Sequence, residues 1–230
     1  MKNALVLFAH PNLKSYCGAF RDLTIKKMTE KNYKVLQSDL YQMKFNPVLH
    51  FGDINPQQKS QKDISITEEL KKTFEMDNLE PDVRVELEKV FAANYLFFIA
   101  PMWYGSFPAI LKGWLERVLI RGAAADLPDE IFSGGLLKGK KCIIVTTTGH
   151  PFEYYSHRGP KAGGQTLQEN YWHIIEQGFA FCGMETLPIF ASYGLDNMTE
   201  KQGKEYLAQY EKMLDNLENI QPIHCPLLHK

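Results

Sequence analysis

The sequence has no excess of charge of either sign and no long apolar run. Lysine and arginine total 26 and aspartate and glutamate total 27 among 230 residues, a formal net charge of −1. This balance gives no electrostatic reason to expect nucleic acid or an anionic membrane as a partner. The first apolar run, residues 4–9, is too short for the core of a signal peptide, and no stretch approaches the roughly 20 apolar residues of a membrane-spanning helix. We therefore expect neither nucleic-acid binding nor membrane insertion.

The sequence also lacks an ordered set of cysteines. Cys17, Cys142, Cys182 and Cys225 form no CxxC pair and have no regular spacing. A disulfide framework would show such spacing, whereas scattered thiols are typical of a reducing compartment. Together with the missing signal segment, this pattern predicts a cytoplasmic protein.

Short segments that are apolar on both faces recur along the chain. Runs of this kind are typical of parallel strands that helices cover on both sides. Three segments have the pattern: residues 4–8, 95–99 and 142–146. Weaker strands are expected over residues 33–38 and 186–191. Pro188 assigns the second of these to a sheet edge, because proline cannot donate a ladder hydrogen bond.

Helical patterns lie between the strands. Ser65 and Glu68 have the spacing of a capping box, and Pro108 suits the first turn of another helix. The expected helices cover residues 19–29, 65–72, 82–92, a segment that starts at 106, 165–181 and 199–217. Because strands and helices alternate, the predicted fold class is α/β, a doubly wound sheet of five parallel strands. Residues 41–63 show no regular pattern, and loops of this length are usually functional or disordered.

The loop after the first apolar strand is suited to a phosphate group. Ligands of an open parallel sheet bind beyond the carboxyl ends of its strands. Residues 10–18 contain neither a GxGxxG fingerprint nor a P-loop, so the usual dinucleotide and nucleoside triphosphate sites lose support. The loop is instead rich in small and hydroxyl-bearing residues and leads into a helix, whose first N–H groups can hold a phosphate.

Aromatic and hydroxyl side chains follow the next two strands. Residues 101–104 (Pro-Met-Trp-Tyr) place two aromatics at a strand end, where they make a flat wall for a planar ring. Residues 147–149 (Thr-Thr-Gly), with Tyr154 and Tyr155 after them, offer hydroxyl and N–H groups to the polar edge of an isoalloxazine. The three loops together describe a flavin site better than a nucleoside or sugar site.

Motifs from several parts of the chain occur together in one known family. They are Leu7-Phe8-Ala9-His10 followed by Ser15-Tyr16, Pro101-Met102-Trp103-Tyr104, Pro108-Ala109-Ile110-Leu111-Lys112-Gly113-Trp114, Thr147-Thr148-Gly149 and Phe181-Cys182-Gly183. With these motifs the sequence resembles the NAD(P)H:quinone reductases of DT-diaphorase type, from the first strand to about the last helix. The resemblance implies a flavodoxin-like fold. We expect residues 1–195 to form the flavin-binding domain and residues 196–230 to form a C-terminal helix and tail that pack on it.

The resemblance also implies an activity. Proteins of this family are NAD(P)H dehydrogenases (quinone), homodimers with FAD, or FMN in some relatives, at the subunit interface. A hydride passes from the nicotinamide to flavin N5 and then to a quinone in the same pocket, in a ping-pong reaction. Residues 57–62 would lie toward the adenine end of FAD. The implied flavin contacts are His10, Ser15, Tyr16, Cys17, Ala19, Pro101, Met102, Trp103, Tyr104, Thr147, Thr148, Gly149 and Tyr155.

Tyr155 is the residue to which the resemblance gives a catalytic role. It matches a tyrosine that hydrogen-bonds near flavin N1 and O2, where a phenol stabilises the negative charge of the reduced ring. The family's partner for this tyrosine is commonly a histidine, and Lys161 occupies that position here, with His157 nearby on the same loop. Lys161 would stabilise the anion, and His157 would shuttle a proton near neutral pH. The sequence leaves open which of the two assists Tyr155.

Several positions depart from the family. Gly105 stands where relatives often carry a second aromatic residue, and His150 replaces a glycine that is usual beside the flavin. One branch of the family binds a metal through two helix histidines and a tail cysteine. Cys225 matches that cysteine, but Glu176 and Ala180 occupy the helix positions, so no metal site is expected.

Two other functions are compatible with such a site. A nitro- or azo-reductase would use the same residues, because the reduced flavin is the hydride donor in each case. A non-enzymatic electron carrier or a regulatory flavoprotein is the second alternative. Flavodoxin carriers are typically smaller and strongly acidic, whereas this chain is longer and near neutral.

Overall fold

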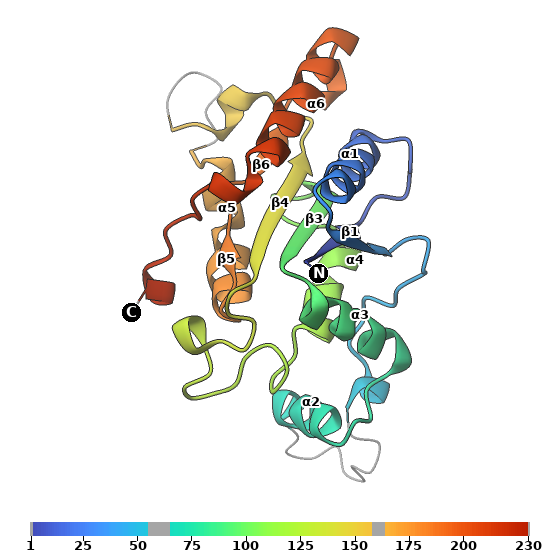
Figure 1. The fold of residues 1–230 in the computed structure, drawn as a ribbon, viewed down its shortest axis with the longest axis vertical. Coiled ribbons are helices and arrows are strands. Elements are labelled where there is room, and N and C mark those ends of the chain that lie inside the picture. The colour runs from blue at the N-terminus through green and yellow to red at the C-terminus, as the bar shows by residue number, and fades with distance from the viewer. Residues whose placement is uncertain (1, 55–64, 158–163, 230) are drawn as a thin grey trace.

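A parallel β-sheet lies at the centre of the molecule, for which the computed structural model describes residues 2–54, 65–157 and 164–229 (Figure 1). The strands are β1 (Asn3–Phe8), β2 (Lys34–Asp39), β3 (Tyr95–Pro101), β4 (Lys141–Thr147), β5 (Glu185–Thr186) and β6 (Phe190–Ser192). Their order is β2-β1-β3-β4-β5, and β6 also pairs with β4. All of these pairs are parallel, so the predicted doubly wound α/β sheet is confirmed.

Helices cover both faces of the sheet. They are α1 (Tyr16–Glu30), α2 (Ile66–Glu75), α3 (Pro81–Ala92), α4 (Ala109–Val118), α5 (Leu167–Ile174), which a π-helical segment (Ile175–Ala180) extends, and α6 (Glu200–Asp215). A separate hydrophobic core lies on each face of the sheet, and two neighbouring residues of β3 point into different ones. Phe97 belongs to the core under α1 and α6, whereas Phe98 stacks on Phe179 at 4.6 Å and meets the edge of Trp114 from α4. Burial on both sides explains why these strands are continuously apolar.

The edge strand is not continuous. We predicted one strand over residues 186–191, but the structure forms β5 and β6 with Leu187, Pro188 and Ile189 between them. Both pieces pair with β4, so the edge position is confirmed. Pro188 has no N–H group, which interrupts the ladder between the two pieces.

One helix start and one helix cap differ from the prediction. Helix α1 begins at Tyr16, three residues before the expected start at 19, because the Ser15 Oγ accepts from the N–H of Gly18 (3.1 Å) and caps it. Helix α2 begins after Ser65 as predicted, but the predicted capping box is wrong. The Ser65 hydroxyl makes no hydrogen bond to the helix backbone, and Glu68 instead pairs with Arg121.

A buried arginine joins the irregular segment 41–54 to the helices. The Arg117 guanidinium, 2% exposed, donates to the carboxylates of Asp53 (Nη2 to Oδ1, 2.6 Å) and Asp82 (Nη1 to Oδ2, 2.7 Å) and to the C=O of Asn46 (2.8 Å). Burial lowers the pKa of Arg117, but the hydrogen bonds to Asp53 and Asp82 outweigh it, and the pKa is raised. The described part of segment 41–63 thus has little regular structure, as predicted, apart from one 3₁₀ turn, yet it is firmly anchored. Residues 55–64 lie outside the described residues.

The same segment approaches helix α4 very closely at Gly113. A Cβ atom on Gly113 would lie 2.0 Å from the C=O oxygen of Pro47, a distance that no side chain tolerates. Glycine is therefore required at this position of the Pro108–Trp114 motif.

The end of the chain packs on α1 and on the sheet edge. The Tyr210 hydroxyl of α6 hydrogen-bonds with the Thr24 hydroxyl of α1 (2.7 Å), and both side chains are buried. The N–H of Ile223 donates to the C=O of Thr186 (2.7 Å), so the tail covers the edge at β5. Such cover removes an exposed row of strand hydrogen-bonding groups.

Residues 2–54, 65–157 and 164–229 contain no helix long and apolar enough to cross a membrane. Within these ranges no three His, Cys, Asp or Glu side chains gather in a way that would hold a metal ion. The four cysteines are buried and free.

We expect Arg117→Met to lower the free energy of unfolding by about 3–5 kcal/mol, because it leaves the Asp53 carboxylate buried without its partner. Urea unfolding of the parent and the variant measures this difference. Arg84→Met is the control, since Arg84 pairs with exposed Asp77 and its loss should cost under about 1 kcal/mol. Equal, small losses in both variants would show that the Arg117 cluster does not hold the segment.

Candidate functional site

The carboxyl end of β3 leads into a tight turn. Trp103 and Ser106 exchange two backbone hydrogen bonds of 3.0 Å. Tyr104 and Gly105, between them, have φ values of +49° and +75°, as in a type I′ turn. Tyr104, at the tip, has a relative exposure of 109%, so its whole ring is available for contact.

Tyr155 joins the ends of β3 and β4. The N–H of Met102 donates to the C=O of Thr147 (2.9 Å), which continues the β3–β4 ladder beyond β3. The Tyr155 hydroxyl lies 2.7 Å from the Thr148 hydroxyl and donates to the Met102 sulfur at 3.4 Å. Burial raises the pKa of Tyr155, and the hydrogen bond with Thr148 offsets this only in part. The side chain is therefore a protonated phenol at neutral pH.

A cavity of about 540 Å³ opens between these loops. Its volume is in the range of small-molecule sites in proteins. It is lined by Met102, Tyr104, Gly105, Thr148, Gly149, His150, Tyr154, Tyr155, Asn170 and Asp196. The predicted residues that the structure brings together here are Met102, Tyr104, Thr148, Gly149 and Tyr155. The site lies at the carboxyl ends of β3, β4 and β6, where ligands of open α/β sheets bind.

Sequence reasoning missed two of the lining residues. Asn170, in α5, donates from Nδ2 to the C=O of Thr166 (2.9 Å), which holds its side chain near the tight turn at Gly105. No signal in the sequence pointed to it. Asp196 follows β6, so its place after the carboxyl end of a strand is the signal in the sequence that points to it.

Pro101, Thr147 and Trp103 surround the cavity without lining it. Pro101 and Thr147 are buried and opposite each other in the β3–β4 register. Trp103 is exposed, and its ring centroid lies 6.5 Å from that of His10. The His10 Nδ1 accepts from the N–H of Asn12 (3.0 Å). Burial lowers the pKa of His10, so the neutral ring is favoured.

None of the side chains that open α1 lines the cavity. The Tyr16 hydroxyl lies only 1.2 Å from the position of a Cβ on Gly203, so this phenol packs on α6. The Cys17 sulfur lies 3.4 Å from the Thr147 hydroxyl, and burial raises the pKa of Cys17 to about 11. Ser15 caps the helix, and half-buried Ala19 continues it. What this helix start offers a ligand is therefore its first backbone N–H groups, which have no acceptor inside a helix.

The structure does not bring His157 into the cavity. Its Nδ1 lies 3.0 Å from the C=O oxygen of Gly164, and its Nε2 lies 3.0 Å from a carboxylate oxygen of Glu169 at the start of α5. Both ring nitrogens are thus engaged, one with the loop before α5 and the other with α5 itself. Lys161 lies outside the described residues.

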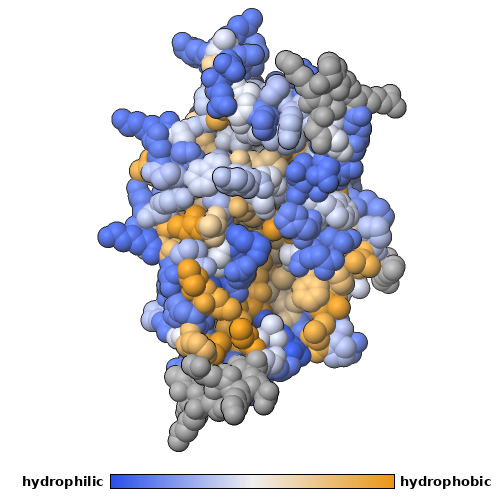
Figure 2. All heavy atoms as spheres, turned by 180° about the vertical axis from the view of Figure 1, so that it is seen from behind, coloured by the Kyte–Doolittle hydropathy of each residue, from blue (hydrophilic) through white to orange (hydrophobic). Residues whose placement is uncertain are grey.

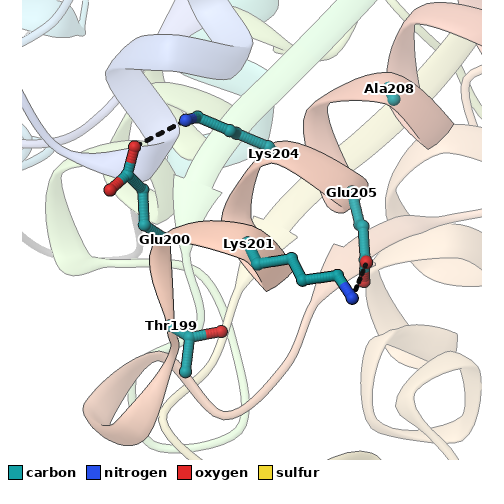
Figure 3. A pocket seen from close by; sticks show the side chains of 6 residues that line it. All are labelled: Thr199, Glu200, Lys201, Lys204, Glu205 and Ala208. Carbon is teal, nitrogen blue, oxygen red and sulfur yellow. Dashed lines mark ion pairs between the residues drawn. The ribbon is translucent and has the colours of Figure 1, made fainter.

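The residues of the cavity fit a flat, partly polar ring system. Tyr104 and Met102 supply apolar surface, while the hydroxyls of Thr148 and Tyr155 supply hydrogen bonds for a polar edge. A second hollow, along the start of α6, does not fit one. It is lined by charged side chains that pair within the helix, Glu200 with Lys204 (2.6 Å) and Lys201 with Glu205 (3.9 Å), and that point to solvent (Figure 3).

Comparison with known proteins agrees with this geometry. The chain is 32% identical to the ribosyldihydronicotinamide dehydrogenase [quinone] of Mus musculus over 97% of this chain and 95% of that protein. A Klebsiella pneumoniae structure described as a quinone reductase has a TM-score of 0.87 and 26% identity, over 97% of this chain and 87% of that chain. An FMN-dependent NADH-azoreductase of Bacillus anthracis, solved with FMN, shares the fold at 15% identity and a TM-score of 0.61, over 94% of this chain and 99% of that chain. The family profile described as flavodoxin-like fold matches residues 2–214, so this chain belongs to the flavodoxin-like family.

Proposed function

We propose that this protein is a flavin-dependent NAD(P)H dehydrogenase that reduces quinones by two electrons. The observation that carries the proposal is the buried Tyr155 phenol, which Thr148 and Met102 hold in a cavity at the carboxyl ends of β3 and β4. Relatives from mouse and Klebsiella pneumoniae that are named for quinone reduction support the choice of acceptor.

Bound flavin would supply the hydride chemistry, taking a hydride from a dihydronicotinamide and passing it to the acceptor. Tyr155 would hold a proton at its phenol oxygen and donate a hydrogen bond where negative charge develops. Tyr104 would cover one face of the ring, and the N–H groups that open α1 would hold the phosphate. We also propose flavin contacts for the predicted residues that do not line the cavity. The partner of Tyr155 would be either His157 or Lys161.

We further infer a homodimer that binds FAD, with FMN as the alternative cofactor. In the family that the sequence resembles, the flavin lies at the interface of two subunits, and a second subunit would complete the site in the same way here. The residues expected near the adenine of FAD, 57–62, lie outside the described residues.

An apolar groove offers a surface for that subunit. It runs between α4 and α5 with its π-helical extension, and Leu115, Leu119, Ile174 and Phe181 are among its lining residues. Figure 2 shows apolar side chains gathered in a hollow on the face turned away from the viewer of Figure 1. Apolar patches of this kind mark interaction sites. We also infer a cytoplasmic location, which the four free thiols support.

The purified protein should be yellow or take up FAD or FMN, and NADH or NADPH should bleach it without oxygen. Menadione should then restore the colour in one two-electron step. Absorbance spectra and mass identification of the released cofactor test both points, and a panel of quinones, nitroaromatics and azo dyes separates the quinone reductase from its alternatives. A protein that binds no flavin would overturn the proposal, and one that binds flavin without oxidising NAD(P)H would favour a regulatory role.

Tyr155→Phe should slow flavin reduction by roughly 10- to 100-fold, because a hydrogen bond to a charged group contributes about 1.5–3 kcal/mol. The raised pKa of Tyr155 keeps the phenol protonated well beyond neutral pH, so the difference should be constant from about pH 6 to 9. Stopped-flow absorbance measures the rate. Tyr33→Phe, which removes a hydroxyl bonded to Glu218 far from the cavity, should match the parent. Equal rates in parent and Tyr155→Phe would remove this role.

Tyr104→Asn should weaken flavin binding by roughly 3- to 10-fold, since a stacked aromatic contributes about 0.5–1.5 kcal/mol. Asparagine tolerates the left-handed backbone of position 104 better than tyrosine does. The free energy of unfolding of the apoprotein should therefore not fall. Titration with flavin and urea unfolding give the two numbers, and unchanged affinity would show that Tyr104 does not contact the ring.

A further inference from the structure

The carboxylate of Asp196 lies on the rim of the cavity, and backbone hydrogen bonds fix its position. Asp196 lies in the 3₁₀ turn Leu195–Asn197, which follows β6. The N–H of Gly194 donates to the C=O of His150 (2.9 Å), and the N–H of Leu195 donates to the C=O of Thr148 (3.1 Å). These bonds tie the turn to the loop that follows β4, so the backbone holds Asp196 beside the Tyr155 end of the cavity.

The carboxylate reaches over the backbone of that loop because residue 149 has no side chain. A Cβ on Gly149 would lie 2.6 Å from the Asp196 Oδ2 and 3.1 Å from its Oδ1. Glycine at this position therefore makes room for the negative charge. Asp196 and Gly149 line the same cavity as Met102 and Tyr155.

The Asp196 carboxylate has no lysine or arginine near it among the described residues that line the cavity. Asp196 is exposed. The lysines that follow it in the chain, Lys201 and Lys204, pair with glutamates of their own helix (Figure 3). The one histidine among the described lining residues is His150, whose ring stacks on Tyr154 at 4.1 Å between centroids.

We propose that Asp196 makes this cavity select electron acceptors that carry no negative charge. The inference rests on the proposed function and names its substrate class: neutral or cationic quinones are accepted, and quinones that bear a sulfonate, carboxylate or phosphate on the ring are disfavoured. Like charges a few ångströms apart repel, and because Asp196 is exposed, water and salt keep this repulsion modest. The electron donor is affected less, because a ribose separates its phosphates from the nicotinamide ring.

The test compares naphthoquinone, its sulfonated derivative and a derivative with a trimethylammonium group. For each, kcat/KM and equilibrium binding to the flavin-loaded protein are measured at pH 8, where histidine is ordinarily neutral. Asp196→Asn should shrink the preference for the neutral over the sulfonated quinone by roughly 3- to 10-fold in both measurements. The same variant should also reduce the preference for the cationic quinone over the neutral one. Raising the salt concentration should narrow the preference of the parent, because salt screens the repulsion.

Asp215→Asn is the matched control. It removes the same charge at the far end of α6, where Asp215 pairs with Lys27 (2.6 Å), and it should leave the preference unchanged. An Asp196→Asn variant that keeps the parent's preference in turnover and in binding would overturn the inference while leaving quinone reduction in place. A charge preference in binding that depends on Asp196, without any turnover, would support the inference and overturn the proposed function alone.

Discussion

Parallel pairing of β3 with β4 determines where the candidate site lies and which residues meet there. The register runs from Tyr95 opposite Lys141 to Pro101 opposite Thr147, and both strands are buried on both faces. A shift by one residue would move every side chain to the opposite core, so packing holds the register strongly. Because the strands end level with each other, Met102 and Thr148 lie close enough for the Tyr155 hydroxyl to contact both.

Helix α4 connects this site to the other end of the sheet. It begins just after the tight turn that carries Tyr104 and ends at Arg117 and Val118, where buried charges anchor segment 41–54. Different interactions therefore dominate at the two ends of α4. At the site, polar groups line an open cavity, whereas the Arg117 cluster pairs its charges with one another, so removing one partner would be costly.

The fold followed from the sequence wherever burial alone decides the structure. Residues 4–8, 95–99 and 142–146 are apolar on both faces, and each became a strand of the central sheet. The prediction of local hydrogen bonds failed where a residue distant in the sequence binds the same side chain. The Glu68 carboxylate could have completed a capping box, but Arg121, far along the chain, competes for it. Pro188 marked the edge strand correctly, although its missing N–H also split that strand in two.

The same distinction applies to the site. The rule that ligands bind at carboxyl ends of strands found Met102, Tyr104, Thr148, Gly149 and Tyr155, because strand ends can be located from buried runs. It could not show that Tyr16 packs on α6 or that His157 turns toward Glu169, since side-chain direction depends on packing between elements distant in sequence. Asn170 lies on a helix whose rotation is set by the core beneath it, and a single sequence carries no signal for that.

A crystal structure of the protein with FAD or FMN tests the account most directly. The account predicts the isoalloxazine ring at the carboxyl ends of β3 and β4, with the Tyr155 hydroxyl within about 3 Å of a flavin nitrogen or oxygen and the Tyr104 ring against its face. A flavin bound elsewhere, or a Tyr155 hydroxyl that still contacts only Thr148 and Met102 beside the bound ring, would contradict it.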